Sequence, residues 1–210
     1  MSTDDVFLNL DSDLDMSVWV DIPTEWPVPG KEDLMPDIPT WANVAAKVIW
    51  DDSPTEPTPQ HIDVLTEILA YAAEHFPKAY PGFEILAHLP NPTDPVLPVA
   101  IGDFDVSELS PEEAETEVRL WSGVDDPNAV EPPIVEDFFS QHLGSGKRVL
   151  RYVINDDDGR VNTALRYGWY IPQLGRQTHL FAYTTDPAHL ISALDDLDAL
   201  ARCIRYDPIR

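Results

Sequence analysis

The chain has 210 residues and a formal net charge of −25 at pH 7, because 38 acidic residues outnumber 13 basic ones. A field of this sign repels nucleic-acid phosphates and anionic lipid headgroups, so we expect neither nucleic acid nor a membrane as a partner. With 43% hydrophobic residues, the chain can nevertheless bury a sizeable core.

The charge is unevenly distributed along the chain. Residues 1–146 contain 30 acidic and four basic residues, whereas residues 147–210 contain eight and nine and are nearly neutral. The only cysteine, Cys203, cannot form an intrachain disulfide. The N-terminus lacks the pattern of a signal peptide, and no apolar run approaches the ~18 residues of a membrane helix. We therefore expect a cytoplasmic protein.

The first half of the chain is predicted to begin with an acidic, mobile arm over residues 1–16. Residues 17–210 are then expected to form one α+β domain, whose first strand over 17–22 is rich in strand-forming residues. Apolar residues at helical spacing predict a short helix over 40–50. Thr58 and Pro59 suit the cap and first position of a longer helix, which Pro77 is expected to end.

Two strands are predicted next, over residues 83–89 and 96–101. Pro98 cannot donate a ladder hydrogen bond, so it favours an edge or a bulge for the second strand. Ser110, Pro111 and Glu113 have the spacing of a capping box, which predicts a short helix over residues 111–116. We expect a strand over 118–121 after it, and mostly loop over 122–147.

The C-terminal part has the clearest pattern. Strands are predicted over 148–155, 161–171 and 177–185, with an Asp-Gly turn between the first two. Asp186 caps a final helix whose large apolar residues recur at steps of three and four. The sequence therefore predicts an α+β fold, with an antiparallel sheet that ends in a three-stranded meander. Helices pack on this sheet in an α/β/α sandwich-like arrangement.

One stretch resembles a nucleotide-binding loop, because Gly144, Gly146 and Lys147 follow one another in the sequence GSGK. A phosphate-binding loop also needs a glycine five residues before Gly146, and Gln141 occupies that position. It further needs a hydroxyl residue after the lysine, where this chain has Arg148, and a helix after the loop. All three requirements fail, so we expect no nucleotide here and no cofactor elsewhere.

The histidines and the cysteine show no pattern typical of zinc ligands, so no metal is expected. No nucleophile elbow is present either, and we predict no catalytic residue. His88 and His179 lie in predicted strands and are candidates to share one face of the sheet. They are candidates for a binding site, or for an enzyme site assembled from distant histidines and an acid.

The run from Arg166 to Tyr170 is the best-placed candidate for recognition. Aromatic residues most often fill cores, but Arg166, Gly168 and Tyr170 alternate along a predicted strand. On an exposed sheet face, they would form a binding platform with Trp169 beside them.

Two stretches of the chain resemble PsbP-like domains. Residues 18–26, VWVDIPTEW, are similar to the opening of these domains, and the final three strands and helix are similar to their ending. Residues 80–90 and 195–202, YPGFEILAHLP and DDLDALAR, also resemble uncharacterised acidic actinobacterial proteins. The PsbP-like resemblance implies an α/β/α sandwich that serves as a non-catalytic binding or assembly module. It assigns no functional residue.

Three hypotheses follow for the function. The first is a protein-binding or assembly module, because no catalytic constellation is apparent and the separated charges favour a homodimer or a cationic protein partner. The second is an enzyme with a site assembled from distant residues. The third is an acidic mimic of nucleic acid that occupies a basic DNA-binding protein, which would require acidic residues along one elongated face.

Overall fold

The structure is a computed structural model that describes residues 6–125, 129–154 and 159–208. It has an α+β fold with a seven-stranded antiparallel sheet and a separate two-stranded sheet, which confirms the predicted fold class. The chain divides into two compact units. The C-terminal unit comprises Met1–Leu14 and Ile101–Arg210, and the N-terminal unit comprises Asp15–Ala100.

Strand β8 is the last strand of the large sheet in sequence order, but it lies in the middle of the sheet. In spatial order its strands are β2 (Trp19–Ile22), β3 (Glu84–His88), β4 (Leu97–Asp105), β8 (Arg176–Thr184), β7 (Val161–Ile171), β6 (Gly144–Ile154) and β5 (Ile134–Ser140). The edge position predicted from Pro98 is therefore wrong, because β4 has a neighbour on each side. Pro98 is tolerated because it is only the second residue of its strand.

The N-terminal unit contains a pair of helices in addition to its strands. Helix α1 (Ile38–Asp51) and helix α2 (Pro59–Ala79) contact each other, and a 3₁₀ turn, η2 (Met16–Val18), precedes β2. Trp41 and Trp50 of α1 and Leu65 and Leu69 of α2 are buried at helical spacing. The predicted helices over 40–50 and after Thr58 are thus confirmed.

Helix α2 begins where the sequence predicted but ends later than predicted. The Thr58 hydroxyl accepts the amide of His61, which confirms the cap. Pro77 does not end the helix, which continues to Ala79, where the Tyr80 amide donates to the carbonyl of Phe76. A proline in the last turn removes only its own hydrogen bond, so the helix tolerates it there.

The C-terminal unit is built on the predicted meander. Strands β6, β7 and β8 pair antiparallel in sequence order, with Lys147 opposite Gly168 and Gly168 opposite His179. Strand β6 begins at Gly144, earlier than predicted, and the expected loop over 122–147 contains β5. Residues 155–158 of the predicted Asp-Gly turn lie outside the described residues.

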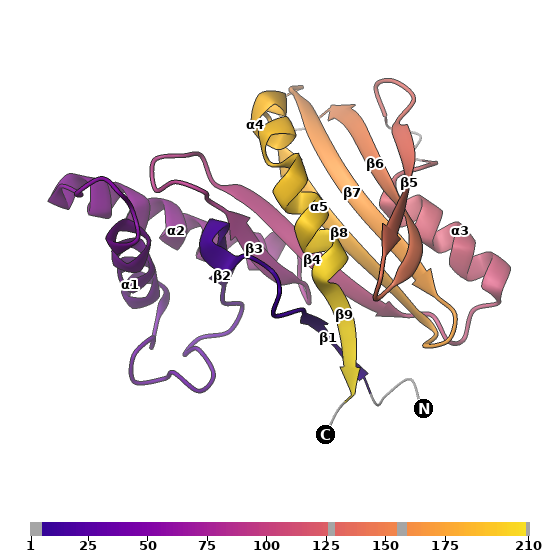
Figure 1. The fold of residues 1–210 in the computed structure, drawn as a ribbon, viewed down its shortest axis with the longest axis horizontal. Helices are drawn as coiled ribbons and strands as arrows, with labels where there is room; N and C mark the ends of the chain where they lie inside the picture. Colours follow the sequence, from indigo (N-terminus) through magenta and orange to yellow (C-terminus); the bar gives the residue numbers. More distant parts are fainter. Residues whose placement is uncertain (1–5, 126–128, 155–158, 209–210) are drawn as a thin grey trace. The chain divides into compact units, whose positions relative to one another are not determined.

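Helices cover both faces of this meander (Figure 1). Successive side chains of β7 point to opposite faces of the sheet. The Tyr167 hydroxyl donates to Asp198 of helix α5 (Leu194–Cys203), whereas Gly168 lies against Ser122 of helix α3 (Pro111–Ser122). We refer to these two sides as the α5 face and the α3 face. Helix α4 (Pro187–Ser192) precedes α5 and also contacts β7 and β8.

Several elements of this unit differ from the sequence predictions. The strand expected over 118–121 is the second half of α3, whose predicted capping box at Ser110 is confirmed. The final helix is divided at Ala193 and followed by strand β9 (Ile204–Pro208). β9 pairs with β1 (Val6–Leu10). Residues 6–10 of the expected mobile arm are therefore a strand, because β9 supplies its hydrogen-bond partners; residues 1–5 lie outside the described part.

No helix in the described ranges is both long enough and apolar enough to cross a lipid bilayer.

Candidate functional site

Strand β5 is an edge strand of the large sheet, and among the described residues β6 is its only neighbour in that sheet. Seven residues, IVEDFFS, supply β-branched and aromatic side chains that favour a strand. Three of its large apolar side chains are exposed, namely Ile134 (56%), Val135 (39%) and Phe139 (66%). An edge strand that exposes both its unpaired backbone groups and its apolar side chains is a surface with which another chain can pair.

Two ion pairs connect the centre of β5 to β6. Glu136 lies opposite Arg148, whose Nη2 is 2.6 Å from its carboxylate, and Asp137 lies opposite Lys147, with which it also pairs. The hydrogen bond from the Lys147 ammonium, together with its positive charge, lowers the pKa of Asp137. Both carboxylates are more than half exposed, so these pairs balance charge at the edge and contribute little stability.

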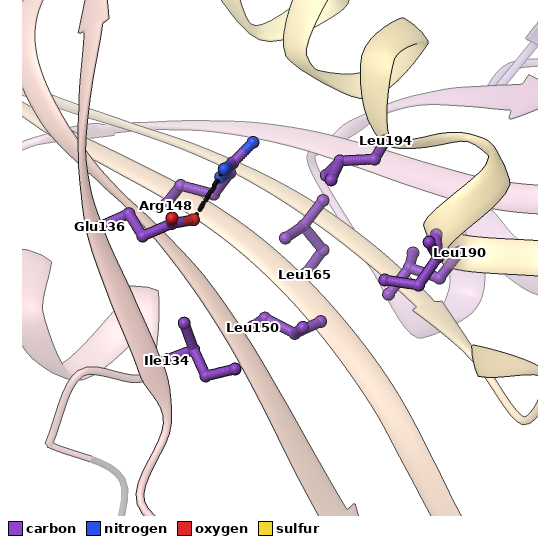
Figure 2. A pocket seen from close by; sticks show the side chains of 8 residues that line it. Ile134, Glu136, Arg148, Leu150, Leu165, Leu190 and Leu194 are labelled. Carbon is purple, nitrogen blue, oxygen red and sulfur yellow. Dashed lines mark hydrogen bonds and ion pairs between the residues drawn. The ribbon is translucent and has the colours of Figure 1, made fainter. Parts of the chain in front are cut away.

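A small apolar cavity opens beside β5 on the α5 face (Figure 2). Its volume is about 50 Å³. Leu165 and Leu190 at its base are buried, whereas Ile134 and Ile191 at its rim are more than half exposed. The Glu136–Arg148 pair lies at one side of it. The six aliphatic residues that line it are Ile134, Leu150, Leu165, Leu190, Ile191 and Leu194.

A half-buried network of charges fixes the polar side of this cavity. Arg148 Nη1 is 2.7 Å from the carboxylate of Asp198, and the Tyr167 hydroxyl donates to the same carboxylate at 2.6 Å. Burial, followed by the hydrogen bond to Asp198, raises the pKa of Tyr167, so its hydroxyl remains protonated and donates. The network holds Arg148 between α5 and β5, and with it the position of Glu136.

The predicted platform around Arg166 is not an open sheet face. Gly168 at its centre is buried beneath α3, with no room for a larger side chain without displacement of Ser122. Arg166 donates to the carbonyl of Trp121 at 2.9 Å and packs on Phe181. Tyr170 remains half-buried, and Trp169 is completely buried on the α5 face. The sequence pattern could not show that α3 covers this surface.

His179 is completely buried among aromatic rings on the α3 face. Phe104, Trp121 and Phe181 surround it at ring-centroid distances of 5.8, 6.2 and 5.8 Å. Burial, with a smaller effect from the positive charge of Arg166, lowers the pKa of His179 to about 3. Its imidazole is therefore neutral near pH 7 and has no solvent-exposed route to a substrate, since the residue has no accessible surface.

His88 lies in the N-terminal unit and has different surroundings. It is 2% exposed in β3 and packs on Trp19 at a centroid distance of 5.0 Å. The two histidines therefore belong to separate units and to separate aromatic clusters.

Another polar network holds β9 in the C-terminal unit. The Tyr206 hydroxyl donates to Asp103 at 2.5 Å and is 2.7 Å from the hydroxyl of Thr178. Burial raises the pKa of Asp103, an effect that the hydrogen bond from Tyr206 opposes. Every member has a protein partner, so the arrangement is a structural one. Within the described ranges, no three histidine, cysteine or acidic side chains are grouped as metal ligands.

Strand β5, which contributes most to the candidate site, was not predicted from the sequence. Its alternation of exposed and buried residues is weak, because only Phe138 and Ser140 are buried. The run of strand-forming residues from Ile134 to Phe139 was the available indication. Neither a protein-family model nor a curated protein matches this chain.

Proposed function

We propose that this protein is a protein-binding module that adds an extended segment of a partner protein to the free edge of β5. The observation that carries the proposal is the exposure of three large apolar side chains on a seven-residue strand at the end of the sheet. In strand addition, main-chain hydrogen bonds provide affinity, and pockets for alternate side chains provide specificity. The cavity beside Ile134 is such a pocket.

The electrostatics favour a basic partner over a second copy of the chain. Two copies would each carry a net charge of −25 and would repel one another at long range. The antiparallel register that places Val135 opposite Phe139 of the other copy also places the two Asp137 residues opposite each other. Like charges directly across a strand pair are destabilising. A partner segment that places lysine or arginine opposite Asp137 would instead stabilise the strand pair, because the two charges attract.

A capped nine-residue peptide of alternating valine and lysine provides a direct test. Residue-resolved amide hydrogen exchange should show slower exchange at alternate amides within 134–140 when the peptide is added. Only alternate amides are expected to respond, because the remaining ones already face β6. A matched peptide with glutamate in place of lysine should bind at least tenfold more weakly.

N-methylated peptides separate strand addition from non-specific contact. Two versions carry N-methyl groups on alternate residues, one along each edge of the extended peptide. Strand addition predicts that only one version loses binding, because only one edge faces β5. Equal binding of both versions, or unchanged exchange throughout 134–140, would overturn the proposal. A dimer in light scattering that Asp137→Asn strengthens would instead identify a second copy as the partner.

A further inference from the structure

The cavity beside β5 has a size that discriminates between kinds of ligand. Sites for metabolites and cofactors usually enclose roughly 300–1,000 Å³. The volume here, about 50 Å³, exceeds the roughly 10–15 Å³ that one water molecule requires but is far below that of a metabolite site. It matches the end of a single aliphatic side chain.

The lining of the cavity selects the chemistry of that side chain. Leu165 and Leu190 at the base offer no hydrogen-bond partner, and the nearby Arg148 is already engaged by Glu136 and Asp198. A polar or charged group would lose hydration there without compensation. An aromatic ring needs more space than the branched end of an aliphatic side chain, and the cavity is small. A branched aliphatic group satisfies both conditions.

The position of the cavity connects it with the edge of β5. Ile134 belongs both to that strand and to the cavity rim (Figure 2). Every second side chain of a strand added to β5 would point to the α5 face, where the cavity opens, and the others to the α3 face, where Asp137 lies. One residue of the partner is thereby placed over the cavity, and its neighbours in sequence lie on the side of the Asp137 carboxylate.

We infer that the cavity is the anchor site for one valine, isoleucine or leucine side chain of a partner segment in which basic residues flank that anchor. This inference rests on the proposed function and specifies the partner. The recognised segment has the pattern basic–aliphatic–basic in extended conformation. The aliphatic residue fills the cavity between β5, α4 and α5, and a flanking lysine or arginine faces Asp137.

The test measures how the affinity of the valine–lysine peptide depends on each valine. Each valine is changed in turn to alanine, and binding is followed by fluorescence anisotropy. One position should stand out with a loss of roughly tenfold, since each buried methyl group contributes about a factor of four. Leucine at that position should bind at least as well as valine, and aspartate should abolish binding.

Variants of the protein identify the cavity as the origin of this dependence. Leu194→Phe fills the cavity from α5 and should reduce the tenfold difference between the valine and alanine peptides to less than twofold. Leu120→Phe, at an exposed position of α3, is the matched control and should leave the difference unchanged. If Leu194→Phe does not fold, Ile191→Ala, at the exposed rim, should reduce the difference about threefold.

The possible failures are distinguishable. If every valine is equally replaceable while the amides of β5 are still protected, strand addition holds and the anchor inference is overturned. If Leu194→Phe and Ile191→Ala both leave the difference intact, the anchor lies elsewhere and the inference is again overturned. If no peptide protects β5, the proposed function itself fails.

Discussion

The two faces of the sheet in the C-terminal unit are stabilised by different interactions. On the α3 face, His179 is enclosed by aromatic rings, and Gly168 allows α3 to approach the strand closely. On the α5 face, Asp198 accepts hydrogen bonds from Arg148 and Tyr167. The α3 face depends on rings packed around a neutral imidazole, whereas the α5 face combines the stacked rings of Tyr167 and Trp169 with a network of charged groups.

This difference explains why the cavity lies on the α5 face. Charged groups must remain paired with one another, so their positions are fixed by hydrogen-bond geometry rather than by the filling of space. Arg148 is held between Asp198 and Glu136, and the aliphatic residues beside it leave a volume of about 50 Å³. The comparison therefore predicts that the two faces respond differently to substitution.

The largest effect is expected for Asp198→Ala on the α5 face. The change leaves the Tyr167 hydroxyl buried without its acceptor and removes one of two carboxylates from Arg148. We expect the free energy of unfolding in urea to fall by about 3 kcal/mol. The matched control, Asp195→Ala in the exposed first turn of α5, should cost less than about 0.5 kcal/mol. Equal effects would show that the network is unimportant.

Alanine substitutions at two glycines on neighbouring strands test how tightly each face is packed. A Cβ at Gly146 would lie 2.5 Å from the Trp169 ring and 2.6 Å from the backbone oxygen of Gly168. A Cβ at Gly168 would lie 3.0 Å from the Cβ of Ser122 and 3.2 Å from the His179 ring. We expect Gly146→Ala to lower the free energy of unfolding by about 3 kcal/mol and Gly168→Ala by about 1 kcal/mol. Thermal or urea unfolding measures both, and the reverse order would contradict the described packing.

Local sequence patterns predicted the elements that local chemistry determines. The caps at Thr58, Ser110 and Asp186 were predictable because each depends on residues no more than three positions away. The meander of β6, β7 and β8 was predictable because its strands are adjacent in sequence, rich in strand-forming residues and separated by residues that favour turns.

Elements that depend on distant partners could not be predicted in the same way. β1 is a strand because β9, almost 200 residues later, pairs with it. The outer edge of β5 is exposed because no further strand of the described part of the chain lies beside it, which the residues of β5 do not encode. The coverage of Gly168 by α3 likewise depends on tertiary packing. The candidate site was therefore missed, although its strand-forming residues were visible in the sequence.

The α3 face should also respond to pH through His179. The pKa of this residue is about 3 in the folded state and 6.5 ordinarily, so below pH 6.5 the unfolded chain takes up a proton that the folded protein does not. Its contribution to stability is complete above pH 6.5 and decreases as the pH falls from 6.5 towards 3. At pH 5 the loss is about 2 kcal/mol.

The variant His179→Leu separates the effect of His179 on the pH dependence of stability from the effect of the many carboxylates of the chain. Between pH 7 and pH 5, the free energy of unfolding of the unmodified protein should fall by about 2 kcal/mol more than that of the variant. Urea unfolding at the two pH values provides the measurement. Parallel decreases in both proteins would mean that the imidazole is accessible to protons in the folded state.

The smallest effect on stability, and the sharpest comparison of the faces, is expected from serine substitutions at two neighbouring residues of β5. Ile134 points to the α5 face and Val135 to the α3 face, and both are exposed. Each change to serine should alter the free energy of unfolding by no more than about 0.5 kcal/mol. Ile134→Ser should weaken binding of the valine–lysine peptide about tenfold, because it removes the aliphatic rim of the cavity. Val135→Ser should weaken it about twofold, because only the lysine stems contact that side; equal losses would place the partner's aliphatic residue on the α3 face instead.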